Sequence, residues 1–200
     1  MILSNDNLQA MISGSIVGTL WPYDCRSTED IESYLRGLVA ELSRSTLLEV
    51  ESDFIHYGSG FASYVHVFCF KRDGKSTVRE RDTDQTDGIA VYLSRLAPVA
   101  AYGPEQRTKS YRRGWFGLRK VVGKSFGNLE AERVGESPPG DWSEAIDEIK
   151  GVLYRFGFFL PSREELSKEL PFAADIPTIL GGPIYGQPYR VFDAVFYWED

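Results

Sequence analysis

Two stretches of helical apolar spacing, one on each side of a strand-rich middle, most constrain how this chain can fold. In residues 28–43 and again in residues 141–157, apolar side chains recur every three or four positions. That spacing predicts two amphipathic helices, each with one face to bury. Ser27 and Asp30 have the spacing of a helix N-terminal cap, and Asp141 is expected to cap the second helix.

The middle of the chain has the character of an antiparallel sheet. Residues 46–54 and 61–72 are rich in β-branched and aromatic side chains, which favour strands. An Asp-Gly pair then predicts a hairpin turn, with residues 76–82 as the returning strand. Residues 88–103 fit either a helix or a buried strand broken by Pro98, and we favour the strand.

The end of the chain predicts one more strand. Residues 191–198 place apolar side chains on both strand faces, which is typical of a strand buried on both sides. Strands and helices occupy separate runs of the sequence, and this separation is typical of α+β proteins. The predicted fold is a single α+β domain over residues 1–200, an antiparallel sheet packed by two main amphipathic helices.

Composition places the protein among ordinary globular chains. Hydrophobic residues make up 42% of the chain and charged residues 26%, a balance that does not fit a disordered protein. No apolar run approaches the ~20 residues of a membrane-spanning helix, and the first residues lack the features of a signal peptide. Cys25 and Cys69 are too few for a disulfide scaffold. The expected location is cytoplasmic, with no membrane partner.

Charge is unevenly distributed along the chain. Between Glu105 and Glu130 there are seven basic residues and no acid, whereas the other 15 bases face all 29 acids and leave a net charge of −14. The seven bases are Arg107, Lys109, Arg112, Arg113, Arg119, Lys120 and Lys124. An acidic body with one basic segment, residues 107–124, repels nucleic acid at long range and attracts basic partners.

Residues 117–128 nearly match two enzyme motifs. The pentapeptide Gly-Lys-Ser-Phe-Gly has the form of a nucleophile elbow. The base of an elbow should follow Ser125, but the chain's two histidines, His56 and His66, both precede it. As a phosphate loop, the segment has one residue too many between its first glycine and Gly-Lys-Ser. We therefore expect neither motif to operate and assign no catalytic residue.

Metal, cofactor and acid–base sites find little support in the sequence. His66 and Cys69 are three apart on a predicted strand, so their side chains should point to opposite faces. The acidic turn at residues 82–88 departs from a calcium loop, because Asp87 stands where glycine is required. No metal and no cofactor is expected. A hydrolase with unrecognised geometry around His56, or around paired acids of the strands, stays open as an alternative.

The basic segment points to an alternative function. Cationic side chains follow phosphates and aromatic side chains stack on nucleobases, so residues 107–124 have the composition of a single-strand nucleic-acid binder. The candidate site consists of Arg112, Arg113, Trp115, Arg119 and Lys120. A second interpretation is a basic ribbon whose aromatics pack on the core and whose charges offset the acidic remainder.

The closing sequence YGQPYRVFDAVFYWED, together with the size, the α+β plan and the negative charge, resembles the small immunity proteins encoded beside bacterial toxins. The resemblance implies a non-catalytic inhibitor whose acidic surface binds a basic toxin domain, with charge complementarity speeding association. The candidate contact residues are Asp82, Asp84, Asp87, Glu199 and Asp200. The partner's identity and the oligomeric state stay open at this stage.

Overall fold

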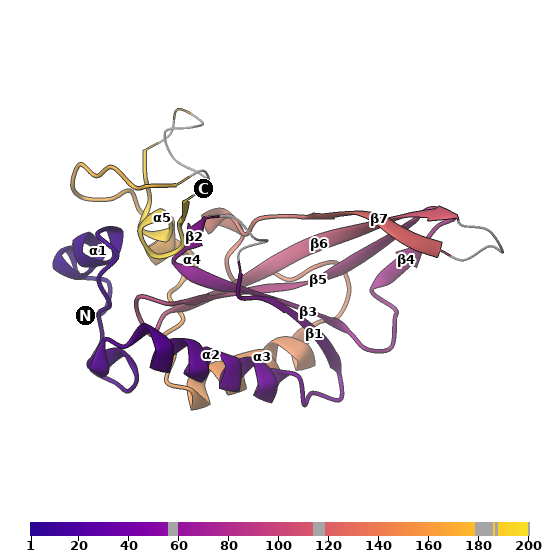
Figure 1. Cartoon of the computed structure of the whole chain (residues 1–200), viewed down its shortest axis with the longest axis horizontal. Coiled ribbons are helices and arrows are strands. Elements are labelled where there is room, and N and C mark those ends of the chain that lie inside the picture. Colours follow the sequence, from indigo (N-terminus) through magenta and orange to yellow (C-terminus); the bar gives the residue numbers. More distant parts are fainter. Residues whose placement is uncertain (56–59, 114–118, 179–185, 187, 200) are drawn as a thin grey trace.

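An antiparallel sheet forms the centre of the molecule (Figure 1). The computed structural model describes residues 1–55, 60–113, 119–178, 186 and 188–199. In the described part of the chain the strands follow the order β1 (Leu48–Asp53), β3 (Tyr64–Lys71), β5 (Thr83–Ser94), β6 (Ala100–Arg113) and β7 (Arg119–Phe126), and β4 (Thr77–Arg79) pairs with β5. All of these pairings are antiparallel, so the predicted α+β fold is confirmed.

Two helices cover one face of the sheet, the lower face in Figure 1, as the apolar spacing predicted. They are α2 (Thr28–Leu42) and α3 (Ser143–Arg155). Their buried side chains share one cluster with every second residue of β3 and β5, among them Val65, Val67 and Val91. Removing these apolar faces from water is the main force that holds the helices on the sheet.

The two predicted helix caps have different outcomes. The Ser27 hydroxyl accepts the Asp30 N–H at 3.2 Å and caps α2, as predicted. The cap position of α3, however, is Trp142 rather than Asp141. The Asp141 carboxylate accepts the N–H of Ser143 at 3.1 Å in a local turn, so α3 begins one residue later than a cap at Asp141 would place it.

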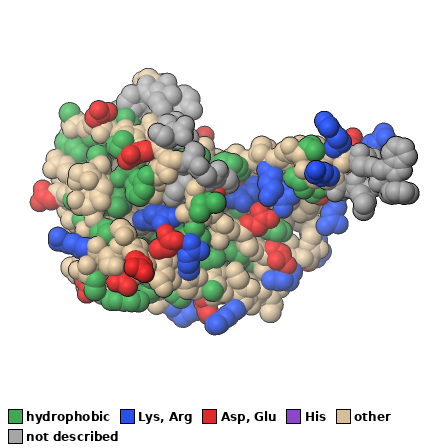
Figure 2. Space-filling model, viewed as in Figure 1, with side chains coloured by type: hydrophobic (Ala, Val, Ile, Leu, Met, Phe, Trp, Pro, Cys, Tyr) green, Lys and Arg blue, Asp and Glu red, His purple; other side chains and the backbone are tan. Residues whose placement is uncertain are grey.

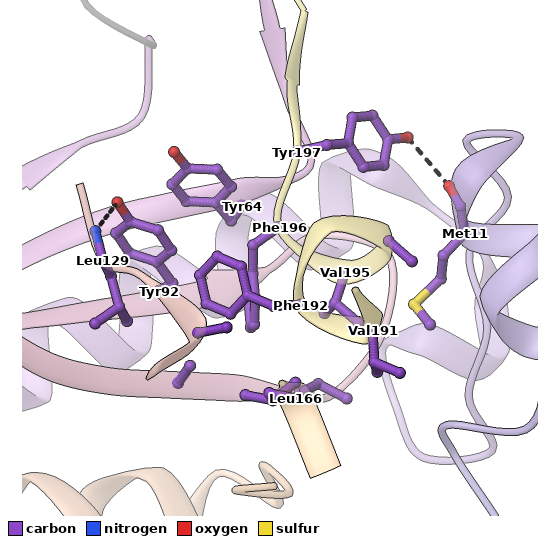
Figure 3. Close-up of a cluster of buried hydrophobic side chains, with 14 of the residues drawn as sticks. Met11, Tyr64, Tyr92, Leu129, Leu166, Val191, Phe192, Val195, Phe196 and Tyr197 are labelled. Atoms are coloured by element: carbon purple, nitrogen blue, oxygen red, sulfur yellow. Dashed lines mark hydrogen bonds between the residues drawn. The ribbon is translucent and has the colours of Figure 1, made fainter. Parts of the chain in front are cut away.

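A second apolar cluster covers part of the opposite face of the sheet (Figure 3). It is built by α1 (Asn5–Ile12), η4 (Ala131–Arg133), α4 (Arg163–Leu166) and α5 (Val191–Val195). Tyr64 and Tyr92 contribute from the sheet and stack with ring centroids 4.2 Å apart. The Tyr197 hydroxyl donates to the Met11 carbonyl at 3.1 Å and ties the end of the chain to α1. The chain thus has a core on each side of its sheet.

The predicted terminal strand is wrong over most of its length. Residues Val191–Val195 form the short helix α5, and only β8 (Trp198–Glu199) is a strand, paired with β2 (Phe61–Ala62). The Asp193 carboxylate accepts the Arg190 N–H at 2.8 Å, which holds the first turn of α5. The apolar side chains are buried as expected, but they meet the core at helical spacing.

Two further strand predictions need correction or refinement. The turn after Lys71 does not make the expected hairpin, because β4 pairs with β5 and not with β3. Residues 88–103 are strand, as favoured, and they supply the end of β5 and the beginning of β6, with Pro98 between them. The 3-10 helix η1 (Tyr23–Cys25) leads into α2. None of the helices in the described ranges combines the length and the apolar character that crossing a membrane requires.

Candidate functional site

The sheet extends beyond the helices that cover it (Figure 1). Along β5 the residues are buried from Gly88 to Ser94 but only partly buried or exposed from Thr83 to Asp87. Glu105, opposite Gly88, marks the same boundary on β6. We call residues 77–87, 106–113 and 119–126, which lie beyond that boundary, the arm. Most of these residues belong to neither apolar cluster, so core packing alone does not explain why the strands extend this far.

The arm and the rest of the molecule carry opposite charge. The arm contains nine Lys and Arg against four Asp and Glu, a net charge of +5, and the remainder contains 13 bases against 25 acids, a net charge of −12. Figure 2 shows Lys and Arg side chains gathered along the projecting arm, with Asp and Glu side chains scattered over the body. The asymmetry expected from the sequence is therefore also a separation in space.

The strand register places bases opposite bases in the arm. Across β6 and β7, Lys109 lies opposite Lys124 and Arg112 opposite Lys120. The last pair in the register joins Arg113 to Arg119. Like charges directly opposite on neighbouring strands are destabilising. Glu51 offsets the charge of Lys109, so in the described part of the ribbon the repulsion between Arg112 and Lys120 is the one that no ion pair offsets.

The three predicted acidic contacts of the middle segment lie on this same arm. Asp84 lies opposite Lys109 on β6, and its carboxylate accepts the Tyr111 hydroxyl at 2.9 Å. The Asp87 carboxylate accepts the Gln106 side-chain amide at 2.9 Å. Asp82 is exposed in the turn between β4 and β5. The arm's bases thus surround these acids, and the acid excess lies on the body.

The structure does not bring Glu199 to the other three acids. Glu199 is in β8, whose partner β2 directly precedes β3 and so lies at the Ser94 end of β5. Along β5, Asp84 is about ten residues from that end, or about 33 Å at the usual strand rise. Asp200 lies outside the described residues. The predicted acidic contacts therefore do not form one patch in the described part of the chain.

The predicted basic site is on the projecting part of the ribbon. Arg112 and Lys120 are exposed, and within the described ranges no ion pair holds either of them. Arg113 ends β6 and Arg119 begins β7, whereas Trp115 lies outside the described residues. Two other aromatics of the segment are engaged: Tyr111 donates to Asp84, and the Phe126 ring lies 6.2 Å from that of His66.

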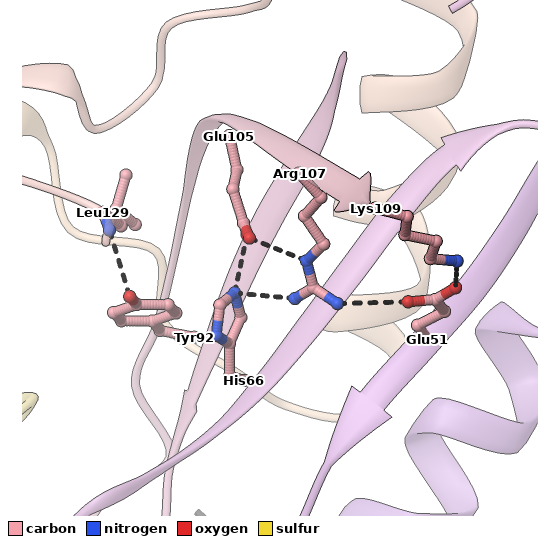
Figure 4. A network of polar contacts seen from close by, with 7 residues as sticks. All are labelled: Glu51, His66, Tyr92, Glu105, Arg107, Lys109 and Leu129. Carbon is pink, nitrogen blue, oxygen red and sulfur yellow. Dashed lines mark hydrogen bonds and ion pairs between the residues drawn. The ribbon is translucent and has the colours of Figure 1, made fainter. Parts of the chain in front are cut away.

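A charged network lies at the root of the arm (Figure 4). His66 Nε2 is 2.6 Å from a carboxylate oxygen of Glu105, whose other oxygen accepts Arg107 Nε at 2.7 Å. Arg107 also contacts Glu51 at 3.3 Å, and Glu51 accepts Lys109 Nζ at 2.9 Å. Partial burial raises the pKa of Glu51, but the neighbouring cations, Lys109 above all, outweigh it and lower that pKa below its usual value.

The network was not predicted, although part of its signal was in the sequence. Strand alternation places the side chains of Glu51, His66, Glu105 and Arg107 on one face of the sheet. However, His66 and Glu105 come from strands that are not neighbours, and β5 lies between them. Their contact therefore depends on the register of two strand pairs, which no local pattern reveals.

Among the described residues, the space beside His66 is too small for a substrate. A depression lined by Asp53, Tyr64, His66 and Trp198 has an internal volume of about 10 Å³, which is room for about one water molecule. The His66 side chain is buried and in contact with Glu105. In the described part of the chain, His66 therefore has the surroundings of a structural histidine that pairs with Glu105. His56, the other residue of the hydrolase alternative, lies outside the described residues.

A larger groove differs from a site for a charged ligand, because the cations on its walls are engaged within the protein. It has a volume of about 550 Å³ and lies between α2 and the turn after β5, with Glu32, Arg36 and Arg95 on its walls. Arg36 and Arg95 both donate to Glu32, at 2.6 and 3.0 Å. The Arg36 guanidinium also stacks over the Phe54 ring at 4.1 Å. These cations are already occupied within the protein.

The nucleophile-elbow motif does not have the geometry that catalysis requires. Ser125 lies within strand β7, opposite Thr108, and not on the strand-to-helix turn that a nucleophile elbow requires. Cys69 belongs to the helix-side cluster, whereas His66 belongs to the network on the other face, so the two cannot share a metal. In the described ranges no group of three or more His, Cys, Asp or Glu side chains forms a metal site.

The buried thiol of Cys69 gives a test of the helix-side core. Burial raises its pKa from 9.0 to about 12, so the folded protein keeps a proton that the unfolded chain loses. We expect this group to lower stability as pH rises from about 9 toward about 12, by about 1.4 kcal/mol per pH unit. Urea unfolding of wild type and Cys69→Val between these pH values should show a shallower decline for the variant. Parallel declines would contradict the burial of the thiol.

Comparisons with protein-family models, with curated proteins and with solved structures give no match.

Proposed function

We propose that this protein is a non-catalytic binding module of the immunity type, a cytoplasmic inhibitor that neutralises a toxin enzyme in a one-to-one complex. The observation that carries the proposal is the excess of acid on the body, a net charge of −12 against +5 on the arm. The small space beside His66 and the engaged cations of the α2 groove also favour binding over catalysis.

The acidic body suits a basic enzyme domain as partner. Exposed acids stand in the first turns of both covering helices, Glu29 and Asp30 on α2 and Glu144 on α3, with Asp147 one turn further along. In the described part of the chain none of these four enters an ion pair. The negative field of these acids raises the encounter rate of a basic partner. Acids at helix N-termini also stabilise the helices themselves through the helix dipole.

The test uses the product of the gene next to this one, which the proposal expects to be a toxin enzyme. We expect a one-to-one complex that abolishes the enzyme's activity, with an association rate that falls as salt rises from about 50 to about 300 mM. Reversing four acids (Glu29→Lys, Asp30→Lys, Glu144→Lys, Asp147→Lys) should slow association about tenfold or more at low salt. Stopped-flow fluorescence measures the rate, and size-exclusion chromatography with light scattering measures the stoichiometry.

The matched control changes net charge in the other direction. The variant Arg44→Glu with Lys75→Glu alters two exposed bases and should speed association with a basic enzyme. The absence of a complex, or an association rate that does not respond to salt, would overturn the inhibitor proposal.

Binding of single-stranded nucleic acid along the arm is the second candidate. The exposed Arg112 and Lys120 favour it, because unpaired cations on a projecting ribbon can follow phosphates. The engagement of Tyr111 and Phe126 within the protein weakens it, because neither ring is presented as a stacking platform. We therefore rank it below the inhibitor.

A further inference from the structure

The arm ends in an unpaired strand edge. β7 is the last strand of the sheet, and among the described strands β6 alone pairs with it. The residues from Lys120 to Ser125 are all exposed. An edge of this length presents a row of backbone N–H and C=O groups that can receive another strand.

Protection against aggregation does not explain the arrangement of charge at this edge. Lysines and bulges on an edge strand both discourage unwanted pairing, and β7 has Lys120, Lys124 and a register shift where Ser110 and Tyr111 face Gly123 and Val121. The neighbouring strand nevertheless carries Arg112 directly opposite Lys120, at a cost in stability, whereas Lys109, opposite Lys124, already pairs with Glu51 at 2.9 Å. A bound anionic group between Arg112 and Lys120 would offset the repulsion that remains.

The edge also exposes apolar side chains between its lysines. Val121 and Val122 have 42% and 56% of their surface exposed. A peptide strand added along β7 would gain from both features, since it can cover the valines and pair its carboxylates with the lysines. A phosphate backbone would use the lysines alone, so this surface favours protein over nucleic acid.

A second copy of this chain is a poor occupant of the edge. Pairing β7 with β7 would bring Lys120 and Lys124 of both copies together. Like charges across a strand pair are destabilising, so the edge disfavours pairing with a second copy. An acidic strand would not meet this repulsion.

We propose that the β7 edge is a docking site for an acidic extended segment of a partner protein, which adds to the sheet as a further strand. The carboxylates of that segment contact Lys120, Lys124 and Arg112, and its backbone pairs with β7. This site is separate from the acidic body, so it does not depend on the proposed inhibition.

The experiment titrates the full chain with a labelled peptide of sequence Thr-Glu-Val-Glu-Glu-Val-Glu-Thr. Fluorescence anisotropy measures affinity at about 50 and about 300 mM salt, and hydrogen exchange measures protection of the β7 amides. We expect salt-sensitive binding, with slower exchange confined to β7. The variant Lys120→Glu with Lys124→Glu should weaken binding about tenfold or more, and it should stay folded because both side chains are exposed.

Arg44→Glu with Lys75→Glu is the matched control, because it gives the same net charge on two exposed side chains outside the arm. It should change the peptide affinity less than about twofold. Equal weakening by both variants, no binding at about 1 mM peptide, or binding without protection of β7 would overturn the proposal. Tighter binding of a single-stranded oligonucleotide of equal charge would also overturn it, in favour of a nucleic-acid partner.

Discussion

Replacing Glu105 by alanine is expected to lower the free energy of unfolding by about 3 kcal/mol. The carboxylate is almost fully buried, with 1% of its surface exposed, and it accepts from His66 and Arg107 at 2.6 and 2.7 Å. Without it, the buried His66 ring and the Arg107 Nε–H lose the carboxylate that they contact, and leaving buried polar groups without this acceptor is costly. Urea unfolding monitored by tryptophan fluorescence gives the change, with an unchanged slope against denaturant.

Glu51→Ala is the control for this prediction. Glu51 contacts Arg107 and Lys109 in the same network, but 38% of its side chain is exposed. Exposed ion pairs contribute little, so we expect a loss below about 1 kcal/mol. A similar loss in both variants would show that burial does not set the cost. A negligible loss for Glu105→Ala would show that the network does not stabilise the root of the arm.

The elements that the sequence predicted well are those with long, regular apolar spacing. α2 follows its pattern from Thr28 to Leu42, and α3 differs from its prediction mainly in where it begins. An apolar pattern that spans several helical turns leaves little ambiguity between helix and strand, because only the helical period fits it. The strands β1 and β3 were also predictable, because both are rich in side chains that favour strands.

The short α5 was mistaken for a strand because five residues fit both periods. Val191 and Val195 are four apart, as are Phe192 and Phe196, yet the same residues also place apolar groups on both faces of a strand. An acid three residues after Arg190 is a local signal for a helix start, and the Asp193 carboxylate does accept the Arg190 N–H. The packing of Phe192 and Phe196 against Tyr92 then decides the outcome, and it comes from about a hundred residues earlier in the chain.

The sequence predicted which residues make up the basic surface, but not how they are arranged in space. The basic segment was expected to be a ribbon or long loop, and β6 with β7 is a ribbon. The proximity of Asp84 to Lys109, and of Lys109 to Lys124, depends on the strand register, which pairing over long sequence distances fixes. Charge counted along the chain therefore located the basic surface, and only the sheet showed that its acids and bases are interleaved.

Gly103→Ala is expected to lower the free energy of unfolding by about 2–3 kcal/mol. Gly103 lies on β6 beneath the segment that contains η4, and a Cβ there would be 2.7 Å from the Arg133 carbonyl oxygen and 2.4 Å from Leu129 Cδ1. The leucine methyl can move, but the carbonyl belongs to a backbone segment that the Gly135 N–H anchors to the Tyr102 carbonyl at 2.8 Å. The substitution must therefore lift that segment from the sheet, at the cost of overpacked contacts.

Gly123→Ala on the neighbouring strand is the matched control. The nearest atom to its added Cβ would be the Ser110 Cβ at 3.8 Å, an ordinary contact, so we expect a change within about 0.5 kcal/mol. Urea unfolding of the two variants and of wild type gives both values. Hydrogen exchange should localise the loss in Gly103→Ala to residues 129–135, which cover the sheet where the body ends and the arm begins. If Gly103→Ala were as stable as Gly123→Ala, the close packing of that segment on β6 would be wrong.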